Sequence, residues 1–273
     1  MSILRMGLIG KNIGASRLSA ALAIMCEDHG RRLDFTPIDT ADDPEFDFDA
    51  TVDDLRLSGW AGVTVTHPWK PAAAAYAGDA MAPGTGDLGA ANTLTFHPLA
   101  GTNTDYTGFL GAWRGVMDRA PGGVAVAGAG GVARAVVPAL AALGAGPIAI
   151  WDTDPSRAEA LARETGARAV PAEAAADAAA EAHGLVNCTP RGMAPDAGSA
   201  FERAWIGGQA WAFDAVYTPT DTPFLQDCTR AGLDCLTGFD LFRSMAMESF
   251  AAYTGLRPDP VATLPKLDPL RPR

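Results

Sequence analysis

Short apolar runs alternate with helix-like stretches along most of the chain. Apolar runs bounded by Gly, Pro, Asn or Asp predict buried strands, and the stretches between them have the apolar spacing of helices. The expected strands span residues 6–10, 33–38, 60–66, 90–96, 124–127, 147–151, 168–170, 184–188, 210–216 and 233–236. The expected helices span 18–29, 49–57, 106–117, 156–164, 172–182, 223–231 and 239–253. This alternation predicts an α/β protein with mostly parallel sheets.

Three local features refine this outline. The sequence His67-Pro68-Trp69-Lys70 predicts the start of a further helix, with Pro68 in a first turn that tolerates proline. GTNTD, residues 101–105, is expected to form a turn. The proline-punctuated tail from Arg257 onward is expected to lie along the surface.

A glycine-rich motif follows the expected strand 124–127 and leads into an alanine-rich helical stretch. It fits the pattern G-x-G-x-x-A and consists of Gly128, Ala129, Gly130, Gly131, Val132 and Ala133. The first glycine permits a tight turn, the second lets the backbone approach a pyrophosphate, and the small last residue packs the helix on the strand. The following strand ends at Asp152, where the motif expects an acid for ribose hydroxyls. A dinucleotide site is the favoured interpretation, and a turn that merely packs a helix on a sheet is the alternative.

Composition and charge exclude several classes of function. The chain has 273 residues and a formal net charge of −11, which argues against nucleic acid or an anionic membrane as a partner. It has no apolar run long enough for a membrane span, and its start does not look like a signal peptide. The four cysteines form no metal-ligand spacing, so we expect no metal site and reduced, buried thiols. These features are typical of a cytoplasmic protein.

Three polar clusters follow expected strands, at the edge where open α/β sheets bind their ligands. They are residues 12–16, residues 64–70, and Asn92-Thr93 together with 102–105. An enzyme that oxidises an alcohol needs a group that takes the hydroxyl proton, and a lysine oriented by a carboxylate can do so. Lys70 with Asp105 is the predicted pair. The alternative is that Lys70 is a solvated helix residue and Asp105 only a helix cap.

Read together, the motifs of this chain resemble those of the shikimate/quinate dehydrogenase family. The matching pieces run from about Met6 to Gly255 and include GLIGKNIGASR, GVTVTHPWK, LGAANT, GTNTDYTGF, VAGAGGVARAV, NCTPRGM and DAVYTPTDTPF. The resemblance implies an N-terminal α/β substrate domain and a Rossmann-type NAD(P)-binding domain, with the last helices returning to the first domain. The implied boundaries are 1–104 with 238–273 for the substrate domain and 105–237 for the Rossmann domain.

The resemblance also implies roles for individual residues. Lys70 and Asp105 match the catalytic pair, with Lys70 as the proton acceptor and donor. Substrate contacts are implied at Ser16, Thr66, Asn92 and Tyr217, and Thr64 and Met245 occupy two further substrate-facing positions. Cofactor contacts are implied at the loop Gly128 to Ala133 and at Asp152, with Thr189 and Gly238 beside the nicotinamide.

Four positions depart from the family pattern, and all lie on the substrate side. Leu18 replaces a second carboxylate-binding hydroxyl, Ser19 a proline, Thr64 an asparagine, and Met245 a glutamine that reaches a ring hydroxyl. With the catalytic pair and cofactor loop retained, the departures suggest an altered substrate. We expect His67 to serve local packing and hydrogen bonding and not to act as a base.

The expected function is therefore an NAD-preferring dehydrogenase acting on shikimate, quinate or a close analogue. NAD is favoured over NADP because the sequence Trp151-Asp152-Thr153-Asp154 puts carboxylates where a 2′-phosphate would bind, with Arg157 as a residual phosphate contact. Two alternatives stay open: a non-catalytic sensor of such acids on the same scaffold, and a methylenetetrahydrofolate dehydrogenase relative. The partner is expected to be a small cyclic hydroxy acid, and the assembly a monomer or homodimer.

Overall fold

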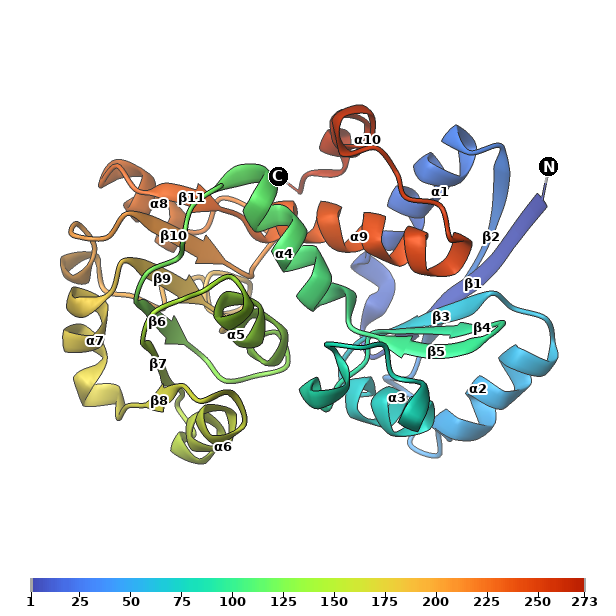
Figure 1. Cartoon of the computed structure of the whole chain (residues 1–273), viewed down its shortest axis with the longest axis horizontal. Coiled ribbons are helices and arrows are strands. Elements are labelled where there is room, and N and C mark those ends of the chain that lie inside the picture. Colours follow the sequence, from blue (N-terminus) through green and yellow to red (C-terminus); the bar gives the residue numbers. More distant parts are fainter. Residues whose placement is uncertain (1, 273) are drawn as a thin grey trace. The chain divides into compact units, whose positions relative to one another are not determined.

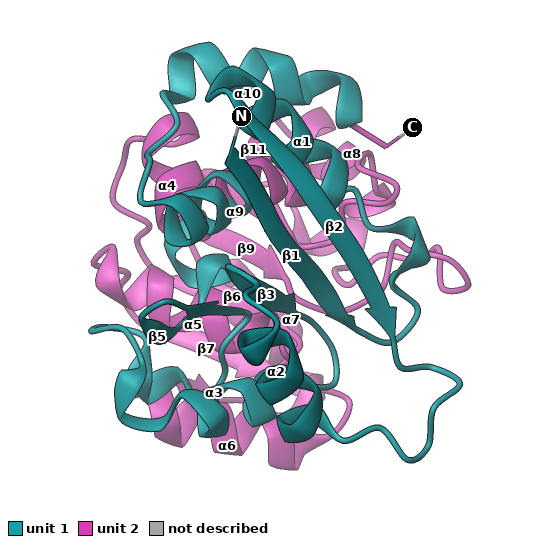
Figure 2. Cartoon of the chain, turned by 90° about the vertical axis from the view of Figure 1, so that its right-hand side faces the viewer, with its two compact units in different colours: residues 1–108, 245–270 teal, residues 109–244, 271–273 magenta. Residues whose placement is uncertain are grey.

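The computed structural model describes residues 2–272, and these form two compact units (Figures 1 and 2). Of these residues, unit 1 comprises 2–108 and 245–270, and unit 2 comprises 109–244 and 271–272. Two long helices, α4 (Thr104–Val116) and α9 (Gly238–Thr254), each contribute residues to both units. Each unit is built around its own sheet.

The sheet of unit 1 has five strands in the order β2-β1-β3-β4-β5. The strands are β1 (Ser2–Gly10), β2 (Arg31–Asp39), β3 (Gly62–Val65), β4 (Thr93–Phe96) and β5 (Leu99–Thr102). β1 pairs in parallel with β2 and β3, whereas β4 is antiparallel to both β3 and β5. The ends of β1, β3 and β5 and the start of β4 therefore lie at one edge of the sheet.

Helices cover both faces of this sheet (Figure 1). On one face α2 (Phe48–Leu57) and α3 (Lys70–Ala77) enclose an apolar core that includes Phe48, Val63, Val65, Ala73 and Leu94. On the other face lie α1 (Leu18–Asp28), the second half of α9 and α10 (Pro260–Leu267). The short 3₁₀ segments of this unit are Ile13–Ala15, Gly78–Ala80, Gly86–Leu88 and Asp268–Leu270.

The sheet of unit 2 has six parallel strands in the order β11-β10-β9-β6-β7-β8. They are β6 (Val124–Ala127), β7 (Ile148–Trp151), β8 (Arg168–Ala169), β9 (Gly184–Asn187), β10 (Trp211–Asp214) and β11 (Asp234–Leu236). Counted from β6, this is the strand order 3-2-1-4-5-6 of the Rossmann fold. The order reverses between β6 and β9, which makes the crevice beyond their carboxyl ends the expected ligand site.

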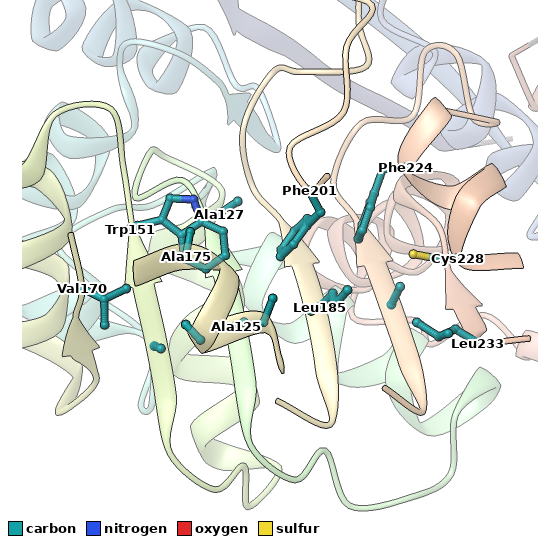
Figure 3. Packing of buried hydrophobic residues seen from close by; sticks show 14 of the residues in the cluster. Ala125, Ala127, Trp151, Val170, Ala175, Leu185, Phe201, Phe224, Cys228 and Leu233 are labelled. Atoms are coloured by element: carbon teal, nitrogen blue, oxygen red, sulfur yellow. The ribbon is translucent and has the colours of Figure 1, made fainter. Parts of the chain in front are cut away.

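Alternate residues of these strands pack on opposite faces of the sheet, as the two-residue period of a strand requires. On the face in Figure 3, Ala125, Ala127 and Leu185 pack with apolar residues of α7 (Ala175–Glu181) and α8 (Pro223–Arg230). Phe213 points the other way and meets Phe109 of α4 edge-on, with ring centroids 5.0 Å apart. The remaining helices of unit 2 are α5 (Ala133–Ala142) and α6 (Pro155–Thr165), with 3₁₀ segments at Ala172–Ala174 and Arg203–Trp205.

The α/β class and the expected Rossmann unit are confirmed, but two local predictions were wrong, and one helix was not predicted. Helix α3 begins at Lys70, so Pro68 precedes it and Pro71 occupies the first turn. Residues 101–102 belong to β5 and not to a turn, because they pair with β4. The tail forms α10, because Asp259 accepts a hydrogen bond from the Val261 N–H and Pro260 suits a first turn.

Several other features bear on the class of protein. None of the helices formed by residues 2–272 is long and apolar enough to cross a membrane. The same residues contain no cluster of His, Cys, Asp and Glu suited to a metal ion. All four cysteines are free, and three are buried, whereas Cys235 is half-buried. Burial raises the thiol pKa at Cys188 and Cys228, which makes these thiols poor nucleophiles.

Candidate functional site

The loops that follow β1 and β3 meet at the carboxyl edge of the unit 1 sheet. The backbone N–H of Lys11 donates to the His67 carbonyl at 3.0 Å, and the N–H of Thr66 donates to the Ile9 carbonyl at 2.8 Å. Because β1 and β3 are parallel neighbours, the two loops leave the sheet side by side. They are the loops that carry Ser16 and Lys70.

Asp39, at the end of β2, fixes the first of these loops. Its carboxylate accepts hydrogen bonds from the backbone N–H groups of Asn12, Ile13 and Ala41, each at 3.0 Å. The bond from Ala41 is the largest of the effects that lower the pKa of Asp39, and the bonds from Asn12 and Ile13 add to it. Sequence reasoning missed this residue, although an acid that ends a strand beside a ligand loop is a usable signal.

Lys70 and Asp105 form the ion pair predicted from the sequence. Lys70 is the first residue of α3 and Asp105 lies in the first turn of α4. Lys70 Nζ donates to Asp105 Oδ2 at 2.6 Å, and the two side chains are 18% and 14% exposed. The pair is thus mostly enclosed but still accessible. Asn103 caps the start of α4, because its Oδ1 accepts hydrogen bonds from the backbone N–H groups of Asp105 and Tyr106. Asp105 therefore is not itself the cap.

Asn92, immediately before β4, is anchored beside this pair. Its backbone bonds to Thr102 and Val65, and the neighbouring Ala91 N–H donates to the Lys70 carbonyl at 2.9 Å. The side chain is buried, and its Oδ1 accepts from the Thr104 N–H at 2.7 Å and from the Thr104 hydroxyl at 3.0 Å. The Asn92 side-chain oxygen is therefore used within the protein, whereas its NH₂ group has no acceptor among residues 2–272.

The other substrate-side residues of unit 1 differ in their surroundings. Ser16 and Thr66 are half-buried, and Ser16 Oγ accepts from the Leu18 N–H at 3.3 Å. Leu18 is only 2% exposed and begins α1 as a core residue. Thr64 is buried, and its hydroxyl is paired with the Tyr253 hydroxyl at 2.7 Å. Burial raises the pKa of the Tyr253 phenol, so that this hydroxyl stays neutral.

Met245 and His67 are the last two residues that the sequence analysis considered on the substrate side. Met245 is half-buried on α9, and its sulfur lies 3.6 Å from Ser249 Oγ. The His67 side chain is exposed, and its contribution to the loop is the backbone carbonyl bonded to Lys11.

The glycine loop of unit 2 has the form that a pyrophosphate requires. Gly128 has a φ of +91°, and a Cβ there would come within 2.8 Å of Thr189 Cγ2. Ala133 is fully buried at the start of α5, as close helix–strand packing demands. Around Gly130 and Gly131 the space is open, and no acceptor among residues 2–272 takes the N–H groups of Gly130, Gly131 or Val132. Free N–H groups at a helix start suit phosphate oxygens.

Two acids and one arginine follow β7 in the chain. Asp152 Oδ2 accepts from the Ala129 N–H at 2.7 Å, which ties the glycine loop to β7. Asp154 caps α6 and lies 3.5 Å from the Arg157 guanidinium. The hydrogen bond from Ser156 is the main cause that lowers the pKa of Asp154. Arg157 thus already has an acidic neighbour.

Beside the loop, Thr189 follows β9 and lies against Gly128, at the reversal of the strand order. Its hydroxyl donates to Asn187 Oδ1 at 2.7 Å. Asn187 in turn donates to Asp214 Oδ1 at 2.9 Å, and Thr222 donates to Asp214 Oδ2 at 2.6 Å. Burial raises the pKa of Asp214 to about 6. Sequence reasoning missed this buried network, since Asn187 and Asp214 lie 27 residues apart and meet only in the fold.

Gly238 and Tyr217 also belong to unit 2, and therefore not to the unit that holds Lys70. A Cβ on Gly238 would come within 2.6 Å of the carbonyl oxygens of Ala215 and Val216, so packing alone requires glycine there. Tyr217 stacks on Phe242, with centroids 5.4 Å apart and planes 3° apart.

The chain is similar over most of its length to characterised dehydrogenases. A family model described as the shikimate dehydrogenase substrate binding domain matches residues 8–94. The quinate/shikimate dehydrogenase (NAD⁺) of Corynebacterium efficiens is 34% identical over 268 residues, covering 93% of this chain and 94% of the relative. The shikimate dehydrogenase (NADP⁺) of Acidiphilium cryptum is 36% identical over 255 residues, covering 92% and 91%. The structure of quinate dehydrogenase from Corynebacterium glutamicum in complex with NAD matches with a TM-score of 0.91 at 30% identity, covering 98% of this chain and 100% of that one.

The Rossmann unit, the lysine–carboxylate pair and these similarities together define an NAD(P)-dependent oxidoreductase that acts on CH–OH groups. The chain belongs to the shikimate/quinate dehydrogenase family. The resemblance noted in its sequence motifs is thereby confirmed.

Proposed function

We propose that this protein is an NAD-preferring dehydrogenase that transfers a hydride between a ring CH–OH of a cyclic polyol carboxylic acid and the nicotinamide. Shikimate, quinate or a close analogue is the proposed substrate. The observation that carries the proposal is the Lys70–Asp105 pair, 2.6 Å apart and mostly enclosed at the ligand edge of the unit 1 sheet. The NAD⁺ and NADP⁺ relatives support the class of reaction and leave the cofactor to be argued from the residues.

In the proposed reaction, Lys70 first releases to solvent the proton that it carries in the ion pair. Its Nζ then takes the substrate hydroxyl proton during oxidation and returns it during reduction. Asp105 orients Nζ and balances the charge that Lys70 acquires with the proton. Bound NAD supplies the carbon that accepts the hydride. Since the proton goes to Lys70 and the hydride leaves the carbon, the CH–OH group becomes a carbonyl group.

The substrate is proposed to be held mainly by hydroxyl and amide groups. Ser16 and Thr66 lie on the two loops at the sheet edge and suit the carboxylate and a ring hydroxyl. Asn92 would donate through its NH₂ group, because its Oδ1 already accepts bonds from Thr104. Thr64 would act mainly as support, since its hydroxyl is paired with Tyr253. Tyr217, on unit 2, remains a proposed substrate contact from the family resemblance alone.

NAD is favoured over NADP by the charges beyond β7. Asp152 and Asp154 would repel a 2′-phosphate, and the Arg157 guanidinium lies 3.5 Å from Asp154. The pyrophosphate would take the N–H groups of Gly130, Gly131 and Val132, while Thr189 and Gly238 would lie beside the nicotinamide. Arg157 is 65% exposed, so we propose a strong preference for NAD and not an absolute exclusion of NADP.

The proposed pocket is poorer in hydrogen bonds than the family pattern. Leu18 is a core residue, and Met245 offers only a weak sulfur acceptor to its surroundings. We therefore propose that shikimate binds weakly or that the true substrate carries an apolar group at one of these places.

The test is a panel of shikimate, quinate, aminoshikimate-like acids and simpler hydroxy acids, each assayed with NAD and NADP by the absorbance of the reduced nicotinamide. The proposal expects turnover of at least one cyclic acid, with a higher kcat/KM for NAD. Comparable efficiency with NADP contradicts the cofactor preference. Calorimetric binding of an acid without any turnover favours a sensor instead.

A further inference from the structure

A chain of buried hydroxyl groups connects helix α9 to the amide of Asn92 within unit 1. Ser249 Oγ lies 2.9 Å from Thr104 Oγ1, which lies 3.0 Å from Asn92 Oδ1. Ser249, Thr104 and Asn92 are 0%, 1% and 2% exposed. Buried polar side chains with fixed partners define one arrangement of their surroundings. Ser249 has no part in the site as the sequence motifs describe it.

The direction of the hydrogen bonds in this chain follows from the acceptors. Asn92 Oδ1 must be the oxygen, because the backbone N–H of Thr104 donates to it at 2.7 Å. A carbonyl oxygen only accepts, and two hydroxyls contact it: Thr104 Oγ1 at 3.0 Å and Thr93 Oγ1 at 3.1 Å. We assign the single hydrogen of the nearer one, Thr104, to Asn92. The 2.9 Å contact between Thr104 and Ser249 therefore uses the hydrogen of Ser249. The competing acceptor of that hydrogen is Met245 Sδ at 3.6 Å, and a thioether is a weak acceptor.

A close helix crossing makes the contact possible. A Cβ on Gly108 of α4 would come within 2.7 Å of Met245 Cα on α9, so the backbones approach as only glycine permits. Gly108 lies one helical turn beyond Thr104, and Ser249 lies one turn beyond Met245. Residues four apart share a helix face, so the crossing that sets Gly108 on Met245 also sets Thr104 on Ser249.

The result is an Asn92 side chain with one possible orientation. Asn92 Nδ2 has no hydrogen-bond acceptor among residues 2–272. It is also absent from the buried polar atoms that lack a partner, so it is not fully enclosed by protein. We propose that Ser249 is a positioning residue: through Thr104 it holds the Asn92 NH₂ group toward the substrate oxygen and so sets substrate affinity. This inference rests on the proposed function for the identity of the ligand.

The test compares Ser249→Ala with Thr254→Ala. Thr254 is a matched control because it lies on the same helix and its hydroxyl donates to the Phe250 carbonyl, away from Asn92. Ser249→Ala should raise KM for the best acid of the panel about 3- to 10-fold, as loss of one hydrogen bond predicts, with kcat and the KM for NAD nearly unchanged. Thr254→Ala should change none of the three.

A second readout needs no turnover. Two-dimensional ¹H–¹⁵N NMR compares the side-chain NH₂ resonances of Asn92 between the unaltered protein and each variant. These resonances are assigned by their disappearance in Asn92→Ala. Ser249→Ala should shift this pair of resonances, because Thr104 loses the donor that orders its hydroxyl. Thr254→Ala should leave them in place.

The outcomes separate this inference from the proposed function. If no acid is turned over by the unaltered protein, the proposed function fails, and the Asn92 resonances alone decide whether Ser249 positions Asn92. Unmoved resonances in Ser249→Ala overturn the inference, and so does an unchanged KM for an acid that the unaltered protein turns over. An equal rise in KM for acid and NAD, with a lower melting temperature, assigns Ser249 a merely structural role and also overturns it.

Discussion

The carboxylate of Asp152 accepts a hydrogen bond from the backbone N–H of Ala129 at 2.7 Å, so the acid that ends β7 also holds the glycine loop that follows β6. Two contributions of Asp152 can therefore be separated by substitution. One is the negative charge, which opposes a 2′-phosphate, and the other is the acceptor that fixes the loop.

Asp152→Asn should weaken the preference for NAD, because asparagine keeps an acceptor for Ala129 but removes the charge. The ratio of kcat/KM for NADP to that for NAD should rise by roughly tenfold, about 1.4 kcal/mol of lost repulsion. Asp152→Ala removes both contributions and should reduce kcat/KM with either cofactor. Steady-state kinetics with both cofactors tests this, and an unchanged ratio in Asp152→Asn would show that the charge does not select the cofactor.

Lys70→Ala should lower kcat by about two to four orders of magnitude, the usual range for a lost acid–base group. The dissociation constant of the substrate should change much less, because the proposed role of Lys70 is proton transfer. Asp105→Asn should also damage turnover, since Nζ loses its charged partner. The matched control is Lys266→Ala, which breaks the exposed Lys266–Asp28 pair, also 2.6 Å long, on α10 and α1. Near-normal kcat in Lys70→Ala would mean that another residue is the base.

The sequence predicted the pairing of Lys70 with Asp105 for a reason that the fold explains. Lys70 and Asp105 lie 35 residues apart, yet both follow strand ends at one edge of a single sheet. Polar residues after strands are visible in a sequence, so this part of the site could be found. The glycine loop and Asp152 were predictable for the same reason, because the motif and the strand end lie next to each other in the chain.

What the sequence did not reveal depends on tertiary partners. β5 (Leu99–Thr102) is short and contains Gly101, and it is a strand only because β4 offers it a backbone partner. The sequence did not predict helix α10, because its prolines disfavour a helix interior, yet Asp259 caps it and Leu267 is fully buried. The role of Asp214 requires Asn187, which lies in a separate motif 27 residues earlier, and Thr222, which lies in its own motif, but no periodicity predicts either hydrogen bond.

Met245→Gln should improve shikimate oxidation, chiefly through KM. A substrate hydroxyl left without a partner costs about 1–3 kcal/mol, or roughly 5- to 150-fold in affinity. The second substitution suggested by the sequence, Leu18→Ser, has a drawback: Leu18 is a core residue, and its truncation should cost about 2–5 kcal/mol of folding free energy, as large-to-small core changes do.

The measurement is KM for shikimate in Met245→Gln, Leu18→Ser and the double variant, together with each melting temperature. We expect the single change Met245→Gln to show the gain most clearly. An ordinary low KM for shikimate in the unaltered protein would refute the idea of an altered substrate, and the two positions would then be natural variation.

Asp214 should make stability depend on pH in the direction opposite to most carboxylates. Burial raises its pKa to about 6 in the folded state, whereas an unfolded aspartate titrates near 4. Between these values the folded state keeps a proton that the unfolded state has lost, so the stabilising effect of that proton declines as pH rises and is lost above about pH 6. The decline amounts to about 3 kcal/mol for a shift of roughly two pKa units.

Asp214→Asn resembles the protonated acid at every pH, so the free energy of unfolding of the unaltered protein minus that of the variant should fall between pH 4 and pH 7. Urea unfolding of both proteins across this range measures the difference, and Asp177→Asn, at an exposed site on α7, is the control that should give a flat difference. A flat difference for Asp214→Asn as well would mean that Asp214 stays ionised in the folded protein, held by hydrogen bonds from Asn187, the Val216 N–H and Thr222.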